Sequence, residues 1–103
     1  MVLSSPITGT LTRDQVRGLV YDELINHSGI DDNKAEDLKK LGDQVVIGSG
    51  FGLETDDVGS IVEDLEISLE TSAGDINLNS ILTVGDLTNV FICALLKEER
   101  IEE

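Results

Sequence analysis

Apolar residues recur along the chain in three long stretches with helical spacing. The first stretch has its apolar stripe at Val16, Leu19, Val20, Leu24 and Ile25. Thr12 is followed three residues later by Gln15, a capping-box pattern that predicts a helix beginning at Thr12. Gly29 follows the last polar turn, and a glycine there adopts the left-handed conformation that ends a helix. The first long helix is therefore predicted from about residue 12 to residue 28.

The other two stretches follow the same rules. The second begins at Thr55, where Asp56 and Asp57 place negative charge in the first turn, next to the positive end of the helix dipole. Its apolar stripe is Val58, Ile61, Val62, Leu65 and Leu69. The third begins at Thr83, with Asp86 three residues later. Its apolar positions are Val84, Leu87, Val90, Phe91, Ala94 and Leu95.

The segments between these helices have weaker patterns. Residues 33–41 predict a short polar helix with Leu38 and Leu41 facing inward. Glycines at 42, 48, 50 and 52 then interrupt regular structure. An isolated apolar triplet at residues 45–47 has no obvious strand partner, so we interpret residues 30–53 as a long loop. The residues expected to pin this loop to the core are Val46, Ile47 and Leu53. Around Ile76, Leu78 and Ile81 the pattern fits an extended piece or a single helical turn.

Together these elements predict an all-α fold, with three long helices and one short helix in a four-helix bundle. We expect a loose N-terminal arm over residues 1–10, a helical domain over residues 11–97 and a solvated acidic tail over residues 98–103. The chain has 40% hydrophobic residues but only one Tyr, two Phe and no Trp. The core must therefore rest on Leu, Ile and Val.

The charge balance narrows the range of partners. With 21 acidic and 7 basic residues the formal net charge is -14. Such a surface repels nucleic-acid phosphates and anionic lipids, so we expect neither as a partner. It attracts proteins that carry a Lys/Arg patch, although the acidic residues can equally serve only to keep the protein soluble. We expect a monomer.

Cysteine content and hydropathy bear on the cellular compartment. Cys93 is the single cysteine, which excludes an internal disulfide, and its apolar helical context predicts a buried, inert thiol. No apolar run approaches the roughly 18 residues of a membrane span. The first residues lack a basic leader with an apolar segment, so we expect a cytoplasmic protein.

Two short motifs connect the pattern to a known family. Gly52-Leu53-Glu54-Thr55-Asp56-Asp57 opens the second long helix, and Thr83-Val84-Gly85-Asp86-Leu87 opens the last. This order resembles the acyl carrier protein family, whose members are small acidic four-helix bundles with a long loop between helices 1 and 2. Their Gly-Leu-Asp-Ser motif carries 4'-phosphopantetheine on the serine. The resemblance covers roughly residues 12–96.

The resemblance implies a function in fatty-acid, lipid or polyketide-type synthesis, with partner enzymes acting on an acyl group held by the arm and no enzyme activity in this chain. The expected partners are a phosphopantetheinyl transferase and acyl-transfer or synthase enzymes with basic patches. The acids implied in docking are Glu54, Asp56, Asp57, Glu63, Asp64 and Glu66. The residues implied to line a pocket for the acyl chain are Val58, Ile61, Val62, Leu65 and Val90.

The attachment position departs from the family pattern. Thr55 aligns with the serine, and its secondary hydroxyl and β-methyl group crowd attack on the donor. Asp56 adds a negative charge beside an anionic donor. Thr55 can therefore be a modified residue or an ordinary helix N-cap. Ser60 lies a full turn inside the predicted helix and is a poor substitute. The alternative function is a carrier-fold protein that has lost the arm and acts as an acidic protein-interaction or regulatory module. A chance resemblance in an unrelated acidic helical protein is the third interpretation.

Other kinds of site find little support. His27 is the only histidine, so we expect no catalytic triad and no His-based metal site. We expect it to lie at a helix end or to face solvent. A calcium loop centred on Gly59 would need ligands at Val58 and Leu65, which have none to offer. The glycines of residues 42–52 lack the Lys of a phosphate loop. We therefore predict no metal site and no catalytic residues.

Overall fold

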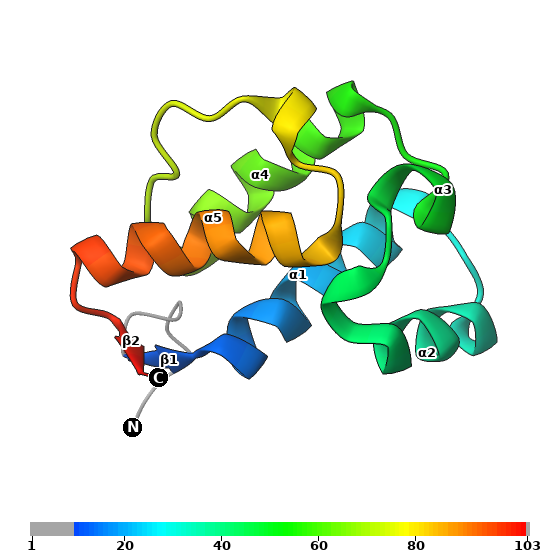
Figure 1. The fold of residues 1–103 in the computed structure, drawn as a ribbon, viewed down its shortest axis with the longest axis horizontal. Helices are drawn as coiled ribbons and strands as arrows, with labels where there is room; N and C mark the ends of the chain where they lie inside the picture. Colours follow the sequence, from blue (N-terminus) through cyan, green and yellow to red (C-terminus); the bar gives the residue numbers. More distant parts are fainter. Residues whose placement is uncertain (1–9, 103) are drawn as a thin grey trace.

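The protein is described by a computed structural model over residues 10–102, and the chain in this range is mostly helical (Figure 1). The described chain contains five α-helices, two 3-10 turns and two very short strands. The α-helices are α1 (Arg13–Ser28), α2 (Asp32–Leu41), α3 (Ile47–Phe51), α4 (Thr55–Leu69) and α5 (Val84–Lys97). The 3-10 turns are η1 (Gly42–Gln44) and η2 (Leu78–Ser80), and the strands are β1 (Leu11–Thr12) and β2 (Ile101–Glu102). The all-α class predicted from the sequence is confirmed.

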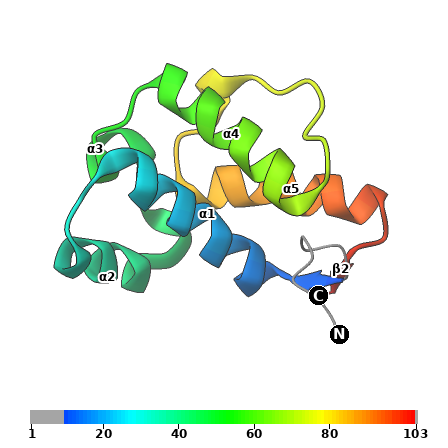
Figure 2. The same cartoon turned by 180° about the vertical axis from the view of Figure 1, so that it is seen from behind.

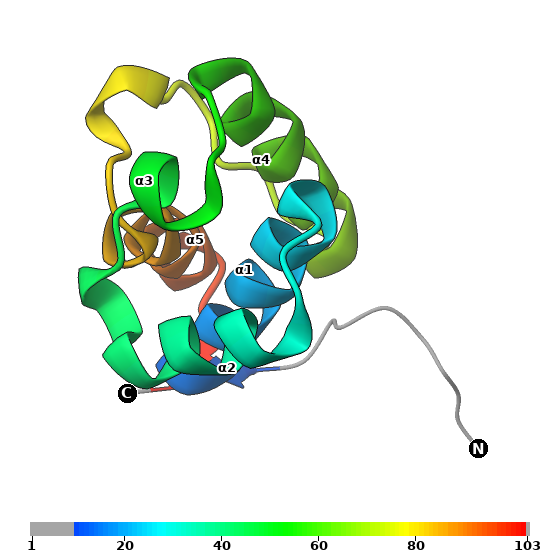
Figure 3. The same cartoon turned by 90° about the vertical axis from the view of Figure 1, so that its right-hand side faces the viewer.

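The three long helices α1, α4 and α5 enclose the core. Helix α1 contacts both α4 and α5, and Figure 2 shows α1 and α4 side by side in front of α5. Figure 3 views the group end-on, with α2 below α1 and α3 near the middle. The fully buried side chains are mainly Leu, Ile and Val, together with Phe91. The predicted aliphatic core is therefore confirmed.

Local capping sets the limits of the long helices. The amide of Gln15 donates to the Thr12 hydroxyl (3.2 Å), and the amide of Thr12 donates to Gln15 Oε1 (2.9 Å). Thr83 and Asp86 make the same reciprocal pair at the start of α5. Gly29 ends α1 with a φ of +71°. These hydrogen bonds satisfy helix-end amides, so the short capping motifs correctly locate the helix boundaries.

Helix α2 begins as expected but faces the core differently. Asp31 caps it by accepting from the amide of Lys34 (2.8 Å). Leu38 is partly buried, but Leu41 is 55% exposed, so the prediction that Leu41 faces inward is wrong. Ala35, three residues before Leu38, is the buried residue of this helix. The inward face of α2 therefore includes Ala35 and Leu38, whereas Leu41 lies on its exposed side.

The predicted long loop contains further structure. Helix α3 forms within it, and Ile47 and Leu53 are buried as predicted. Val46 is 47% exposed, so its predicted role in the core is wrong. Val46 instead pairs with Thr83 in an isolated antiparallel bridge, with Ile47 N donating to Leu82 O (2.9 Å). The apolar triplet at residues 45–47 therefore pairs with the segment just before α5. The hydrophobic periodicity of one segment cannot reveal a contact with residues so distant in the sequence.

The C-terminal residues are held against the rest of the protein. Strand β2 pairs in parallel with β1, with Leu11 opposite Ile101, and Ile101 packs against the core. The prediction of a solvated tail is therefore wrong for this segment. The predicted arm at residues 1–10 lies outside the described residues except for Thr10, which is exposed.

Cys93 is exposed, and the prediction of a buried thiol is wrong. The cysteine interrupts an apolar run in which Ile92 and Ala94 are both buried. On a helix, however, Cys93 shares its face with Asn89 and Leu96, which are exposed. Among the described helices, none is long and apolar enough to cross a membrane.

Candidate functional site

Thr55 is the first residue of α4 and is exposed. The N-cap is Glu54, with φ -104° and ψ 172°, so the interpretation of Thr55 as the N-cap is wrong. The amide of Glu54 donates to Asp57 Oδ2 (2.9 Å). Within residues 10–102 the Thr55 hydroxyl makes no hydrogen bond. The capping function is carried by neighbouring side chains, which leaves the Thr55 hydroxyl free.

The turn that presents Thr55 is anchored on its N-terminal side. Gly52 ends α3 with a φ of +69°, and its amide donates to Gly48 O (2.8 Å). A left-handed residue is needed at this point, which explains the glycine. Leu53 is buried in the core directly afterwards. The chain therefore leaves a fixed point two residues before Thr55.

A partly open cavity of about 220 Å³ lies beside Thr55. It is bounded by α3, the start of α4, η2 and the segment that leads into α5. Its lining consists of Val46, Ile47, Gly48, Leu53, Glu54, Thr55, Val58, Leu78, Asn79, Ile81 and Leu82. Most of these side chains are aliphatic, and the polar ones at the helix start include Thr55. An apolar chain attached to the Thr55 hydroxyl would begin at the edge of this cavity.

The cavity has different walls from those implied by the resemblance. Of the five implied pocket residues, only Val58 lines it. Ile61 and Leu65 are fully buried, Val62 is buried, and Val90 is partly buried against the core. Leu78, Ile81 and Leu82 also line the cavity and were not predicted to do so. Their apolar character was visible, but their position next to α4 depends on the path of the chain between α4 and α5.

Of the six acids implied in docking, two are exposed without ion pairs among the described residues, and four contact other residues of the protein. Asp56 and Glu63 are exposed and form no ion pair with any residue of the described chain. Glu66 accepts from the amide of Ala73 (2.7 Å) and holds the connection that follows α4. The others also sit at or near α4: Glu54 caps the helix, Asp57 accepts from the Glu54 amide, and Asp64 contacts His27.

An exposed stripe of α4 contains Asp56, Ser60, Glu63 and Ile67 at helical spacing. Ile67 is 74% exposed and lies beside Glu63 and Glu66 around a shallow surface hollow. Ile67 is the one apolar residue around this hollow, and the other lining residues are Glu63, Glu66, Thr71 and Ser72. Ser60, considered above as an alternative attachment residue, lies on this stripe within α4 rather than at its start.

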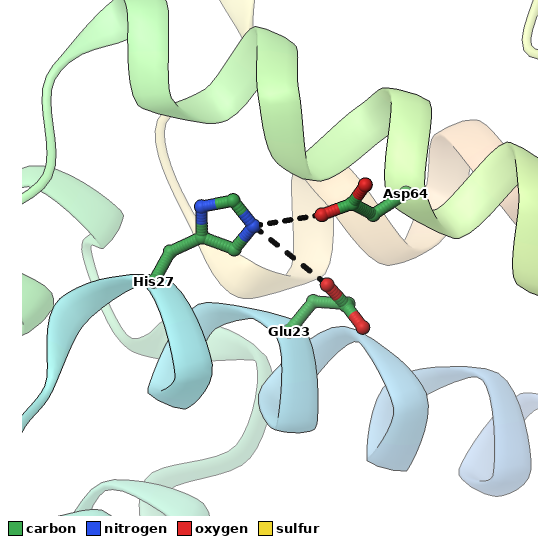
Figure 4. Close-up of side chains that lie close together, drawn as sticks. All are labelled: Glu23, His27 and Asp64. Carbon is green, nitrogen blue, oxygen red and sulfur yellow. Dashed lines mark hydrogen bonds and ion pairs between the residues drawn. The ribbon is translucent and has the colours of Figure 1, made fainter.

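A second polar cluster joins α1 to α4. His27 Nε2 lies 2.9 Å from Asp64 Oδ2 and 3.8 Å from Glu23 Oε1 (Figure 4). Burial, with the nearby charge of Asp64 as the next largest cause, raises the pKa of Glu23 above its usual value. His27 was predicted to lie at a helix end or to face solvent; it does lie in the last turn of α1, and it contacts both carboxylates.

Comparison with protein-family models, with curated proteins and with solved structures found no significant match.

Proposed function

We propose that this protein is a carrier-protein-like domain that holds an acyl or related group on a 4'-phosphopantetheine arm attached to Thr55. The observation that supports this most directly is the position of the Thr55 hydroxyl. It is exposed, free of hydrogen bonds within residues 10–102, and located at the edge of an apolar cavity. In this proposal α1, α4 and α5 correspond to the three long helices of the carrier bundle, and η2 to the short one.

The attachment chemistry requires a nucleophilic hydroxyl and a donor. Thr55 Oγ1 would attack the phosphorus that bears the pantetheine group of coenzyme A. The new bond is the phosphodiester to Thr55, and the bond that breaks joins this phosphorus to the adenosine 3',5'-bisphosphate leaving group. The hydroxyl proton passes to a base of the transferase. The present chain contributes the hydroxyl and its exposed position, and the transferase contributes the catalysis.

The cavity fits a small apolar cargo. Sites for drug-sized ligands have volumes of about 300–1,000 Å³, whereas this cavity measures about 220 Å³. Val46 and Leu82 are both partly exposed and line it, so part of its exposed wall is aliphatic. A short acyl chain on the arm would be shielded here from water, while the arm's thiol carries it as a thioester.

Partner docking would use the exposed stripe of α4. Asp56 and Glu63 would attract basic patches on the transferase and on acyl-transfer or synthase enzymes, which accelerates encounter. Ile67 would supply the apolar contact at the centre of the acidic surface. These residues share the helix that begins at Thr55, so a docked enzyme would lie close to the arm.

The alternative function is a carrier-fold protein without an arm, acting as an acidic interaction or regulatory module. The observation that favours it is chemical. The β-methyl group of Thr55 crowds an attacking hydroxyl, and the exposed Asp56 adds negative charge beside an anionic donor. In that case the same α4 stripe serves as the binding surface, and the Thr55 hydroxyl has no role.

The two functions are separated by incubating the purified protein with coenzyme A and a broad-specificity phosphopantetheinyl transferase. Intact-mass spectrometry should detect the gain of one phosphopantetheine group in the native chain. Thr55→Ser should gain it faster because the primary hydroxyl is less crowded, and Thr55→Ala should gain none. Ser60→Ala should behave like the native chain.

A different pattern would favour the module without an arm. If Thr55→Ser is modified and the native chain is not, the fold presents residue 55 correctly but threonine does not react. Recovery of the same partner proteins with native chain and Thr55→Ala would then support the interaction module. If neither the native chain nor Thr55→Ser is modified, the carrier proposal is wrong.

A further inference from the structure

The cluster of Glu23, His27 and Asp64 lies apart from Thr55. Glu23 and His27 are four residues apart on α1 and therefore share one face of that helix. Asp64 projects from α4, and Figure 4 shows its carboxylate and that of Glu23 on the same side of the imidazole. Asp64 lies nine residues beyond Thr55, which is roughly 13 Å along the helix axis.

The three side chains bring their donor atoms close together. His27 Nε2 is 2.9 Å from Asp64 Oδ2 and 3.8 Å from Glu23 Oε1, and the three donor atoms lie within 4.8 Å of one another. Zinc bonds to histidine nitrogen and carboxylate oxygen are about 2.0–2.2 Å long, so neighbouring donors around the ion lie roughly 2.9–3.5 Å apart. The distance between His27 and Asp64 already falls in this range, whereas Glu23 would have to move closer to His27.

The local charge also favours a cation. Glu23 and Asp64 are both carboxylates, and in residues 10–102 no Lys or Arg side chain lies within 4.0 Å of either. Within residues 10–102, His27 is the basic side chain that contacts both carboxylates. The protein as a whole has a net charge of -14, which raises the concentration of divalent cations at its surface.

The geometry points to a binding site for a first-row divalent metal ion of the zinc type, held by Glu23 and His27 of α1 and by Asp64 of α4. The donor set decides the class of metal. An imidazole nitrogen suits zinc, nickel, cobalt and copper, whereas magnesium and calcium prefer sites made only of oxygen. Water completes the coordination. The proposed site differs from the expectation that a single histidine excludes a metal site, because two helices would supply the other donors.

Metal binding would join α1 to α4. Each of these helices has its buried face in the same core, and the ion would connect them at their partly exposed edge. Because an ion bound only by the folded state stabilises that state, saturating zinc would raise the free energy of unfolding. The site is separate from Thr55, so it does not depend on the proposed carrier function.

The test measures zinc binding by isothermal titration calorimetry, on full-length protein carrying Cys93→Ser. This background is needed because the exposed Cys93 thiol can itself bind zinc. The expected result is one saturable zinc per chain that excess magnesium or calcium does not displace. His27→Gln and Asp64→Asn should each weaken the zinc Kd about tenfold or more, since each removes one of three ligands. The matched control is Glu63→Gln, which changes the neighbouring exposed acid of α4 and should leave the Kd unchanged.

A second measurement needs no substitution in the cluster. Zinc should shift the imidazole resonances of His27, the single histidine, in an NMR spectrum of the Cys93→Ser protein. The proposal is overturned if these resonances do not move at saturating zinc. It is also overturned if His27→Gln, folded by circular dichroism, keeps the same Kd, or if Glu63→Gln weakens binding as much as Asp64→Asn does. Such results would describe diffuse attraction to an acidic surface.

Discussion

Gly85 shows how a single residue is fixed by its surroundings. It is a buried residue in the first turn of α5, and a Cβ atom built there would lie 2.8 Å from Asp43 Cβ and 3.2 Å from Asp43 O. The glycine therefore allows α5 to approach η1 closely. From the sequence, Gly85 stands out only as part of the motif from Thr83 to Leu87. The neighbour that requires a glycine there, Asp43, is 42 residues away in the chain and belongs to a turn that was not predicted.

Replacing Gly85 with alanine should destabilise the protein. Alanine is the better helix former by about 1 kcal/mol, but overpacking against a backbone neighbour costs about 1–3 kcal/mol. The net loss should be about 1 kcal/mol, within a range of roughly 0–2 kcal/mol, measured by urea denaturation. Gly18→Ala is the matched control, because nothing lies within 4 Å of the added Cβ in the middle of α1, and it should stabilise the protein. Equal effects at the two glycines would contradict this explanation.

Asp86 gives the stability a pH dependence. The amide of Leu82, and then that of Thr83, donates to its carboxylate, and these hydrogen bonds lower the pKa of Asp86 below its usual value. A lowered folded-state pKa contributes stability that is present above pH 3.8, the ordinary value, and is lost as the pH falls through the folded-state value.

Asp86→Asn should therefore be less stable than the native chain at pH 7, by roughly 0.5 kcal/mol, since it removes a negative charge from a helix N-terminus. The deficit should shrink as the pH falls below 3.8. Urea denaturation at pH 7 and at pH 3 would measure it. If the stability deficit of Asp86→Asn is the same at pH 7 and at pH 3, the negative charge of Asp86 does not cause it.

At the scale of elements, the sequence predicts helix ends better than the connections between helices. Thr12 and Thr83 lie beside the partners that make them caps, so their local patterns suffice. Helix α3 and the bridge from Val46 to Thr83 depend on contacts between distant segments. The candidate site divides in the same way. The start of α4 at Thr55 was predicted, whereas the part of the cavity wall formed by η2 and the segment before α5 was not.

Tyr21 couples α1 to the end of α2. Its hydroxyl lies 2.9 Å from Leu38 O and 2.5 Å from Gly42 O. These carbonyls belong to the last turn and the C-cap of α2, where helix geometry leaves oxygens without partners. Tyr21→Phe should remove this hydrogen bonding and lower the free energy of unfolding by about 1 kcal/mol.

The loss should be concentrated in α2. Native-state hydrogen exchange should show amides of α2 exchanging faster in Tyr21→Phe. Amides of α4 that exchange through local openings in which α2 stays folded should change less. If only global unfolding accelerates and α2 behaves like the rest, Tyr21 supports the whole core rather than this one helix.

For the whole molecule, charge and exposed surface are arranged around α4. Thr55 and the cavity lie at its start, and the acidic stripe with Ile67 follows along its exposed side. The cluster of Glu23, His27 and Asp64 lies between α4 and α1. One helix would thus present the arm, the docking surface and one metal ligand, with its apolar face held in the core by Val58, Ile61 and Leu65.

The most direct test of the carrier proposal is the intact mass of the protein purified from its native host, with fragmentation to locate any added group. The proposal predicts a population heavier than the sequence by one phosphopantetheine group, with the addition on Thr55. A chain that carries no addition when the host's own carrier proteins are modified, or one whose addition lies on another residue, would contradict it.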